Sequence, residues 1–415
     1  MTRIVSLTPN RVERDTRTFK EAASFARHGI DSVVVEAVRS GVAPELLPFR
    51  LHGAAPQPSA APAAAPRADG VPARQAWRRL PRPVRAAFER ALRVPLTIAH
   101  YLLGEWRAAA SLPQADVYWL HGYHQFPQAW LATRRHRARL VYDAHDFYPE
   151  FLEGGDGTAL ERRVMRGFYL AIERACVRSA AEVITVSDGV ADLIAGRNGR
   201  RPLLVRNAAE LRGLPDDGPD VRSAAGVPAG AFLVVMPGNH KAGMRAIGEA
   251  VESFAALPER AHLAFVGDGY GDVAAQAARL GIGDRVHVLP AVAAAEVPAF
   301  IRSADAIAVL YLPTMRAIEF ALPNGFFSAI AAGLPLLWPL RLPEIRRLAE
   351  QHGLGVAIEP EDPASIAAGV RELLEHPDEV EALRANVRRA REQLNWEAEE
   401  RTLLALVARL TGGRG

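Results

Sequence analysis

Short, uninterrupted apolar runs alternate with longer amphipathic stretches along most of this 415-residue chain. Apolar runs without strict alternation are typical of parallel strands buried on both faces, and the amphipathic stretches are typical of helices that cover those faces. Because consecutive parallel strands need a right-handed crossover, the pattern predicts an α/β fold with open parallel sheets. The expected strands are Ile4–Thr8, Ser32–Glu36, Val117–His121, Leu140–Asp143, Val183–Val186 and Leu203–Arg206, followed by Phe232–Met236, His262–Val266, Val286–Leu289, Ala306–Leu310, Leu336–Trp338 and Val356–Ile358.

This strand rhythm stops and restarts once. The polar, turn-rich stretch Gly213–Pro219 separates the two strand series, and 415 residues exceed what one hydrophobic core usually serves. We therefore expect two Rossmann-like domains, one before residue 213 and one from it onward, that face each other across a cleft. Ligands in such sheets bind at the carboxyl ends of the strands.

Charge and cysteine content exclude several classes of function. Fifty basic and 47 acidic residues leave a formal net charge of +3, which is too small an excess to indicate nucleic acid as the main partner. The single cysteine, Cys176, excludes an internal disulfide and a cysteine-rich zinc site. The chain starts with a strand pattern rather than an export signal, and no apolar run reaches the roughly 18 residues of a membrane span. These features predict a cytoplasmic protein.

One segment leaves contact with a membrane surface open. Residues Ala54–Gly70 are rich in alanine and proline, which predicts a flexible or extended loop inserted in the first domain. The segment Arg74–Arg107 then carries eight arginines against two glutamates, with aromatic residues between them. Arginine beside aromatic residues fits peripheral docking on an anionic membrane, at the inner face for a cytoplasmic protein. The alternative is an ordinary helix with a solvated arginine face.

Nine segments spread over nearly the whole chain form a recognisable series. They are Val12–Val35, RLVYDAHDFYPEF (Arg139–Phe151), Ala181–Ile194, Leu203–Glu210, HLAFVGDGY (His262–Tyr270), Arg285–Val292, Ser303–Pro313, LPNGFFSAIAAGLPLL (Leu322–Leu337) and Gly353–Val370. In this order they resemble the motifs of family 4 glycosyltransferases.

That resemblance implies a GT-B fold and transfer of a sugar from a nucleotide-sugar donor, a UDP- or GDP-sugar, with no metal ion and no other cofactor. The acceptor stays unknown, and a lipid-linked acceptor is one option. The resemblance also implies a final helix, about Trp396–Leu410, that crosses back to the first domain. The N-terminal acceptor domain would then comprise residues 1–212 and 396–415, and the donor-binding domain residues 213–395.

The turn in MPGNHKAGMR is the first expected donor-binding segment. Departure of a nucleoside diphosphate builds negative charge, which cations and backbone amides must neutralise when no metal is present. Gly238 and Gly243 let the backbone come close to the ligand, and Asn239 is expected to bind the donor in the same turn. Lys241 and Arg245 are expected to reach phosphate oxygens, with Lys241 acting in catalysis. The alternative for Lys241, one of only two lysines in the chain, is a solvated loop cation.

The segment around Asn324 is the second. Asn324 is expected to cap a helix whose first amides point at the ligand, with Gly325 and Phe326 beside it. Gly325 stands where the family usually has lysine, and Ser328 where it has the glutamate that binds the donor ribose. A serine makes one hydrogen bond where a carboxylate makes two charge-assisted ones. Glu319 does not have the spacing of a replacement and is expected at the surface.

Two further turns are expected to hold the base of the donor. Gly267, Asp268 and Gly269 follow a strand, and a tight turn there suits the carboxyl edge of the sheet. The resemblance implies that this turn and the loop near Val292 hold the base by backbone contacts.

In the first domain, His145 and Asp146 follow the fourth strand and are the expected catalytic residues on that side. The resemblance implies that His145 contacts the transferring sugar or its phosphate, a role that suits a side chain whose charge adapts near neutral pH. The alternative is a histidine satisfied by backbone at a strand end. Glu150, Asp15 and Arg17 are candidates for the acceptor site, although Asp15 and Arg17 equally fit an ion pair that caps the first helix.

Three functions remain in competition on the sequence alone. The first is a glycosyltransferase, retaining, that acts in the assembly of a cell-surface glycan or a glycosylated metabolite. The second is a non-catalytic relative that serves as an accessory subunit, motivated by the loss of the signature lysine and glutamate. A nucleotide-sugar 2-epimerase shares the fold but matches the motif order less well.

Overall fold

The computed structural model describes residues 1–52, 82–145, 158–215, 217–240 and 243–412, with the backbone alone at 82–91. Contacts divide the chain into two compact units, Met1–Ile184 with Val407–Gly415, and Thr185–Leu406. This division lies before the boundary expected at Gly213–Pro219. Ser187 and Gly189 explain the position, because they donate hydrogen bonds of 2.8 Å to the Phe320 carbonyl and to Glu344 Oε1 within the second unit.

The first sheet has seven strands in the order β3-β2-β1-β4-β5-β6-β7. The strands are β1 (Arg3–Thr8), β2 (Asp31–Glu36), β3 (Arg50–His52), β4 (Val117–His121), β5 (Arg139–Ala144), β6 (Glu182–Thr185) and β7 (Leu203–Leu204). Strands β1 to β5 pair in parallel, with Ile4 beside both Ser32 and Val117. The carboxyl ends of these strands therefore meet at one edge, which is where a ligand site is expected.

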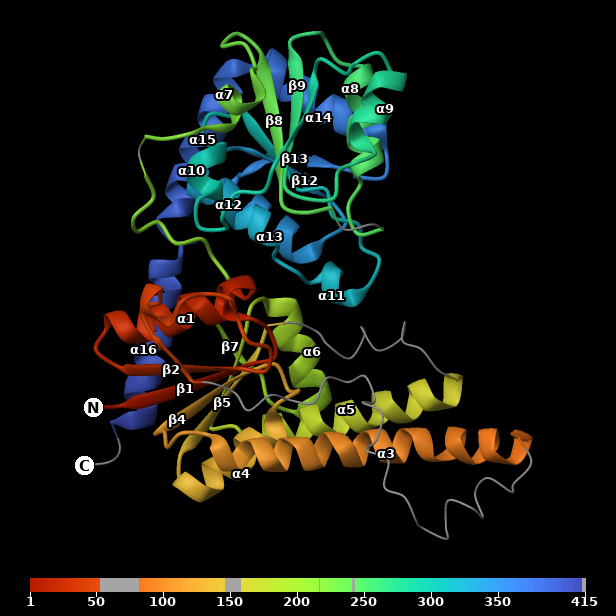
Figure 1. Cartoon of the computed structure of the whole chain (residues 1–415). Helices are drawn as coiled ribbons and strands as arrows, with labels where there is room; N and C mark the ends of the chain where they lie inside the picture. The colour runs from red at the N-terminus through yellow and green to blue at the C-terminus, as the bar shows by residue number, and fades with distance from the viewer. Residues whose placement is uncertain (53–81, 146–157, 216, 241–242, 413–415) are drawn as a thin grey trace. The chain divides into compact units, whose positions relative to one another are not determined.

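Helices cover both faces of this sheet, as the apolar runs predict. They are α1 (Thr16–Arg27), α3 (Arg82–Ser111), α4 (Phe126–His136), α5 (Ala159–Ser179) and α6 (Asp188–Asn198), with short 3-10 turns at Val12–Arg14 and Pro44–Leu46. Helix α1 lies on one side of the sheet, and α4 and α5 lie on the other (Figure 1). Helix α1 buries Thr18, Glu21, Ala22 and Phe25, a spacing that puts them on one helix face.

The second sheet has six parallel strands in the order β10-β9-β8-β11-β12-β13. They are β8 (Phe232–Pro237), β9 (Ala261–Val266), β10 (Val286–Leu289), β11 (Ala306–Ala308), β12 (Leu336–Pro339) and β13 (Gly355–Ile358). The strand order reverses at β8, which lies between β9 and β11. This reversal is the switch point at which open α/β sheets bind ligands.

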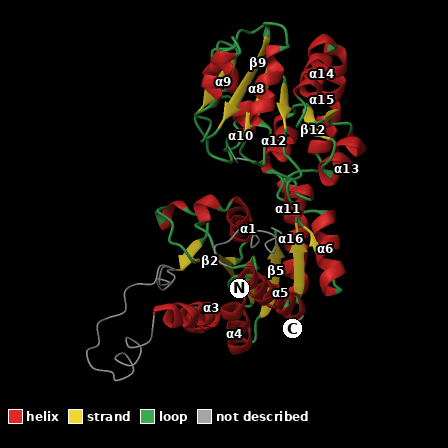
Figure 2. Ribbon diagram, turned by 90° about the vertical axis from the view of Figure 1, so that its right-hand side faces the viewer, coloured by secondary structure: helices red, strands yellow, loops and turns green. Residues whose placement is uncertain are grey.

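The core of the second unit has two layers, one on each face of its sheet. Successive residues of β8 alternate between them, with Leu233 and Val235 in one layer and Val234 and Met236 in the other. The helices that supply the first layer are α7 (Val221–Ala225), α10 (Val297–Ile301), α12 (Asn324–Ala332), α13 (Pro343–His352) and α15 (Pro377–Arg391). Those that supply the second are α8 (Ile247–Ala255), α9 (Val273–Arg279) and α14 (Pro363–Glu375), of which α8 and α9 lie near β9 in both views (Figure 1 and Figure 2). The short helix α11 (Arg316–Glu319) precedes α12.

These features confirm the expected pair of Rossmann-like α/β domains. Each of the twelve expected strands is present, although the strand expected at Leu203–Arg206 shortens to Leu203–Leu204. Strand β3 was not expected, because Arg50–His52 has no apolar run. The final helix α16 (Trp396–Thr411) begins and ends close to the expected residues, starting in the second unit and finishing in the first.

The structure describes only part of the two unusual segments that precede residue 108. The alanine- and proline-rich stretch Ala54–Gly70 lies outside the described residues, as does the start of the basic segment. From Arg82 onward the basic segment is helix α3, which runs through Pro95 to Ser111. Among the helices that the structure describes, none combines the length and the apolar character needed to cross a bilayer.

Candidate functional site

A buried group of charged residues lies at the carboxyl edge of the first sheet. Asp143 belongs to β5, His145 follows that strand, and His121 ends the neighbouring strand β4. Helix α1 adds Arg17 and Glu21. The side chains of Asp143, His121 and Glu21 are completely buried, and that of His145 is 12% exposed. We refer to these five residues as the Asp143 network.

Asp143 is the centre of this network. Arg17 donates to it twice, from Nε to Oδ2 at 2.6 Å and from Nη2 to Oδ1 at 2.9 Å. Oδ2 also lies 3.0 Å from Nδ1 of His121 and 3.2 Å from Nδ1 of His145. Burial by itself raises the pKa of Asp143, but the Arg17 charge, the nearby His145 and the histidine hydrogen bonds outweigh it and hold that pKa well below its ordinary value. Asp143 is therefore an ionised carboxylate that can only accept hydrogen bonds.

Because the histidine nitrogens and an Asp143 oxygen lie within 4.8 Å of one another, the same atoms must be considered as a cation site. Oδ2 of Asp143 already accepts from three donors, and the Arg17 guanidinium occupies both oxygens of the carboxylate. A cation there would displace these donors and face a positive charge. The donor set suits a hydrogen-bonded carboxylate better than a metal centre.

Asp15 and Arg17, both expected at the acceptor site, have separate structural roles. Asp15 caps helix α1, since it accepts from the Thr18 amide at 3.1 Å and from the hydroxyls of Thr18 and Thr8 at 2.7 and 2.8 Å. Arg17 pairs with Asp143 and, at 3.2 Å, with Glu21. The capping half of the alternative is therefore right, whereas an Asp15–Arg17 ion pair as the cap is wrong, because Arg17 turns to the strand residue Asp143.

His145 lies at the end of β5, as expected, and its Nδ1 faces the Asp143 side chain, not only backbone. Asp146 and Glu150 lie outside the described residues, and so does Lys241. Their catalytic and acceptor roles stay predictions.

In the second unit, the turns after β8 and β9 pack against each other. The amide of Asp268 donates to Asn239 Oδ1 at 3.0 Å, and the amide of His240 donates to the Asp268 carbonyl at 2.8 Å. Gly267 has a φ of 151°, and a Cβ there would lie 2.7 Å from the Gly238 carbonyl oxygen. Glycine is therefore required at this crossing of two backbones. The expected donor-binding turns are adjacent.

Arg245 does not have the role expected from the sequence. Its side chain turns inward and is 5% exposed, with Nη1 donating to the Gly238 carbonyl at 3.0 Å and to the Tyr270 hydroxyl at 2.8 Å. Nη2 lies 3.3 Å from the Pro237 carbonyl, and the guanidinium lies over the Tyr311 ring. Arg245 therefore holds the carbonyl side of the turn, because both terminal nitrogens of its guanidinium donate to the protein.

Helix α12 also differs in detail from the expectation. Pro323 occupies the N-cap position, and Asn324 is the first helical residue, whose Oδ1 accepts from Asn207 Nδ2 at 3.0 Å. Asn324 is therefore not the cap. The Phe326 side chain is fully buried in the core, so only its backbone remains for a ligand. Ser328 is 8% exposed.

Gly325 and Val292 complete the expected donor site. A Cβ on Gly325 would meet only Pro237, at 4.0 Å, so the N-terminal turn of α12 lies beside the end of β8. Val292 is half-buried against the core, which leaves its backbone as the contact that a base could use. Turns after β8 and β9 and the start of the helix after β11 thus lie on three neighbouring strands.

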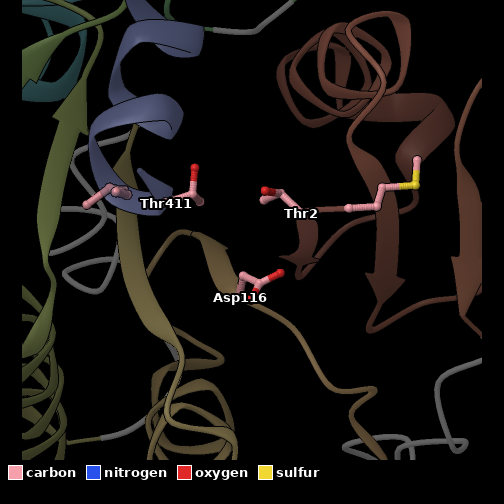
Figure 3. A pocket seen from close by; sticks show the side chains of 5 residues that line it. Thr2, Asp116 and Thr411 are labelled. Atoms are coloured by element: carbon pink, nitrogen blue, oxygen red, sulfur yellow. The ribbon is translucent and has the colours of Figure 1, made fainter. Parts of the chain in front are cut away.

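Two hollows in the described residues can be compared with these sites. One, of about 210 Å³, is lined by Thr2, Asp116 and Thr411 together with Met1 and Leu410, and it lies at the amino ends of β1 and β4 (Figure 3). It is on the edge opposite to that of a Rossmann-like ligand site. The other, of about 610 Å³, lies where β11 and β12 end, and its lining residues are Pro313, Glu319, Leu340, Arg341, Pro343 and Arg346.

Sequence reasoning missed His121, Asp143 and Glu21 as site residues. The spacing of His121 and His124 in HGYH is weak as a metal motif and does not mark His121 as a site residue. The available signal was topological: His121 and Asp143 end neighbouring parallel strands, and their register pairs them directly. Nothing in the sequence marked Glu21 as a site residue, since an i, i+4 pair of arginine and glutamate on a helix normally indicates an exposed ion pair.

Two family models match the chain. Residues 15–209 match the glycosyl transferase 4-like domain, and residues 231–376 match the glycosyl transferases group 1. The chain belongs to the family 4-like glycosyltransferases. It is an enzyme of sugar transfer, and an accessory subunit without activity is not favoured.

Relatives of this glycosyltransferase agree with the assignment. D-inositol 3-phosphate glycosyltransferase 1 of Catenulispora acidiphila is 26% identical over 337 residues, which cover 76% of this chain and 78% of the relative. Sucrose-phosphate synthase from Thermosynechococcus elongatus superimposes with a TM-score of 0.68 at 14% identity, over 99% of this chain and 100% of that one. Anabaena HepE in complex with UDP-glucose gives 0.69 at 15% identity with the same coverage.

WaaG, a glycosyltransferase involved in lipopolysaccharide biosynthesis, gives a TM-score of 0.65 at 17% identity with complete coverage of both chains. The glycosyltransferase therefore has the GT-B fold. A putative UDP-N-acetylglucosamine 2-epimerase from Listeria monocytogenes also superimposes, with a TM-score of 0.60 at 13% identity. The fold alone does not separate transferase from epimerase, whereas the two family models do.

Proposed function

We propose that this glycosyltransferase takes its sugar from a nucleoside-diphosphate donor, UDP- or GDP-linked, and binds that donor in the second unit without a metal ion. The observation that carries the proposal is the convergence of the two packed turns and the start of α12 at the switch point of the second sheet. Backbone amides of such turns and of a helix N-terminus favour a diphosphate. HepE, a structural neighbour, is described in complexes with UDP and UDP-glucose, which supports the same donor class.

Within this site, the expected contacts bind different groups of the donor. Backbone at Gly238, Asn239 and Gly325 faces the diphosphate, and backbone at Asp268 and Val292 holds the base. Ser328 offers the ribose one hydrogen bond in place of a carboxylate, which weakens donor binding. Lys241 supplies the cation that stabilises the leaving phosphate.

Donor binding can be tested without knowledge of the acceptor. UDP, GDP, ADP and UMP are added to the enzyme, and the melting temperature is recorded; a diphosphate with the right base should raise it, and a monophosphate should raise it less. Lys241→Ala should lower affinity or turnover about 10- to 150-fold, the effect of one charge-assisted contact. Arg279→Ala, at the exposed C-terminal end of α9, is the matched control. Stabilisation by none of these nucleotides would contradict the proposal.

The first unit is proposed to bind the acceptor and to present His145 to the donor sugar or its phosphate, with retention of anomeric configuration. The anomeric proton signals of the product, followed by NMR from the start of the reaction, would report retention or inversion directly. A first-formed product of opposite configuration to the donor would contradict the retaining reaction.

We also propose that the enzyme works at an anionic membrane surface on an acceptor for a cell-surface glycan. Most of the strongly exposed large apolar side chains in the described residues lie on α3 and α5, including Trp106 at 63% and Leu160 at 71% exposure. The two helices contact each other, with the Tyr101 ring 5.8 Å from that of Phe168. Arginines at exposed positions, among them Arg93 and Arg163, accompany the apolar side chains. Basic charge beside exposed leucine and tryptophan fits an anionic interface.

Vesicle binding tests this surface. Sedimentation with phosphatidylglycerol vesicles should capture the enzyme at low salt and release it as salt rises. The double variant Leu96→Ser/Trp106→Ala should bind at least several-fold less, whereas Leu280→Ser, an exposed leucine of the other unit, should bind like the wild type. Equal binding by the double variant would remove the membrane proposal and leave α3 as a helix with a solvated arginine face.

A further inference from the structure

The Asp143 network contains more ionisable groups than contact with a sugar requires. Only His145 retains partial exposure, and Arg17, Glu21, His121 and Asp143 lie behind it with exposed fractions of 3% or less. Burying four ionisable side chains is costly unless their charges and hydrogen bonds are matched. Each of these four buried residues is therefore expected to have a defined partner and charge.

The hydrogen bonds define the protonation of both histidines. Asp143 is ionised and can only accept, so the Nδ1 atoms of His121 and His145, at 3.0 and 3.2 Å from the same oxygen, must each carry the proton. In its neutral form each ring then has an unprotonated Nε2. For His145 this is the nitrogen that Asp143 does not engage, and it can accept a hydrogen bond or take up a proton.

Glu21 stands behind His121. Its Oε2 lies 3.9 Å from Nε2 of His121, and both atoms are buried without a hydrogen-bond partner among the described residues. Two acceptors that face each other need a proton on one of them. The pKa of Glu21 is raised to about 7, chiefly by burial; the Asp143 charge adds to the rise, and Arg17, His121 and His145 oppose it. A proton on Glu21 therefore faces Nε2 of His121, and the buried Asp15 is the other acidic group that His121 and His145 face.

We propose that Arg17, Glu21 and His121 are positioning residues, which fix the Asp143 carboxylate and through it hold His145 as the Nδ1–H tautomer with Nε2 turned to the reacting sugar or phosphate. Arg17 sets the plane of the carboxylate through two bonds, and His121 fills the remaining direction of Oδ2. Glu21 supplies the proton that lets His121 stay buried. The inference rests on the proposed role of His145 and deepens it.

The test combines a spectroscopic measurement with turnover. In enzyme labelled with 15N-histidine, two- and three-bond 1H–15N correlations distinguish the tautomers, and His145→Gln and His121→Gln assign the two rings. The wild type should show His145 as the Nδ1–H form. Asp143→Asn should shift His145 toward the Nε2–H form and lower kcat about 10- to 150-fold, the effect of one hydrogen bond to a charged group, with a smaller change in the KM for the donor.

A second variant covers the case in which Asp143→Asn fails to fold. His121→Phe keeps the bulk of the ring and removes its donor, so it should loosen the Asp143 carboxylate and mix the tautomers of His145, with a fall in kcat of several-fold or more. His376→Gln, an exposed histidine after α14, is the matched control for both readouts.

The outcomes separate this inference from the proposed function. A His145 that keeps the Nδ1–H tautomer in the folded variants of Asp143 and His121 would overturn the inference, whatever their activity. A tautomer that changes while Asp143→Asn and His145→Gln transfer sugar at the wild-type rate would instead overturn the role of His145, and with it the positioning role. A tautomer and a kcat that change together support both.

Discussion

Replacement of Arg245 by methionine distinguishes two roles for this residue. The sequence predicts a cation that binds donor phosphate, whereas the structure shows a buried guanidinium that donates to the carbonyls of Pro237 and Gly238 and to the Tyr270 hydroxyl. Methionine keeps most of the stem volume and removes every donor. The variant should therefore lose stability first, and donor binding only because the turn relaxes.

The expected magnitude follows from the contacts. A buried hydrogen bond to a charged group contributes about 1.5–3 kcal/mol, and bonds that share one guanidinium are not additive. The Gly238 carbonyl also keeps the Tyr270 hydroxyl as a donor, which limits the loss. We expect the free energy of unfolding of the second unit to fall by about 3 kcal/mol. The melting temperature of a unit of 150–250 residues changes by about 2–4 °C for each kcal/mol of stability, so that of the second unit should fall by roughly 6–12 °C.

Calorimetry of the variant, with UDP titrated in a separate experiment, measures both quantities. Arg279→Met is the control, because this exposed side chain should change stability by no more than about 0.5 kcal/mol. A variant that melts like the wild type but loses ten-fold or more in nucleotide affinity would refute the structural argument and restore the phosphate contact.

Three further results are expected. Because the pKa of Glu21 is raised to about 7 in the folded enzyme from an ordinary 4.5, its stabilising contribution is complete below pH 4.5 and is lost as pH rises through 7. In urea unfolding from pH 5 to 8, the free energy of unfolding should fall by up to about 3 kcal/mol more in the wild type than in Glu21→Gln. Parallel curves of free energy against pH for the two proteins would contradict the assignment. Gly267→Ala should destabilise the second unit by about 1–3 kcal/mol and weaken nucleotide binding. Gly283→Ala is the control, because its Cβ would meet nothing closer than 3.8 Å. Equal melting temperatures for Gly267→Ala and the wild type would show that the Gly238 turn moves to accommodate the added Cβ. Sugar transfer should continue unchanged in EDTA, and a loss restored by a divalent cation would contradict a metal-free donor site.

The fold was predictable because its determinants are local and repeated. Parallel strands buried on both faces need mostly apolar side chains, so β8 and the part of β4 before His121 are visible as unbroken apolar runs. The edge strand β3 escaped notice because an edge position makes no such demand on Arg50–His52. The carboxyl edge of each sheet as the ligand side followed from the strand–helix order, whereas the switch point at β8 became visible only in the observed strand order.

The site was predictable only as a set of places. His145 at a strand end and Gly267 in a tight turn follow from position and residue type. The partners of charged residues did not follow, because Arg17 meets Asp143 across 126 positions of sequence. Helix α1 must pack on the sheet before that distance closes.

Sequence alone therefore determined the two parallel sheets, the order of the motifs and the edge at which ligands bind, since hydrophobic periodicity and glycine at a turn act over a few neighbouring residues. Tertiary structure decided that Arg245 faces the protein interior, that Pro323 rather than Asn324 caps α12, and that Glu21 is buried beside His121. Hydrogen bonds and charges depend on distances of a few ångströms between segments remote in sequence. Those distances are set by strand register and helix packing, which no local pattern of residues encodes.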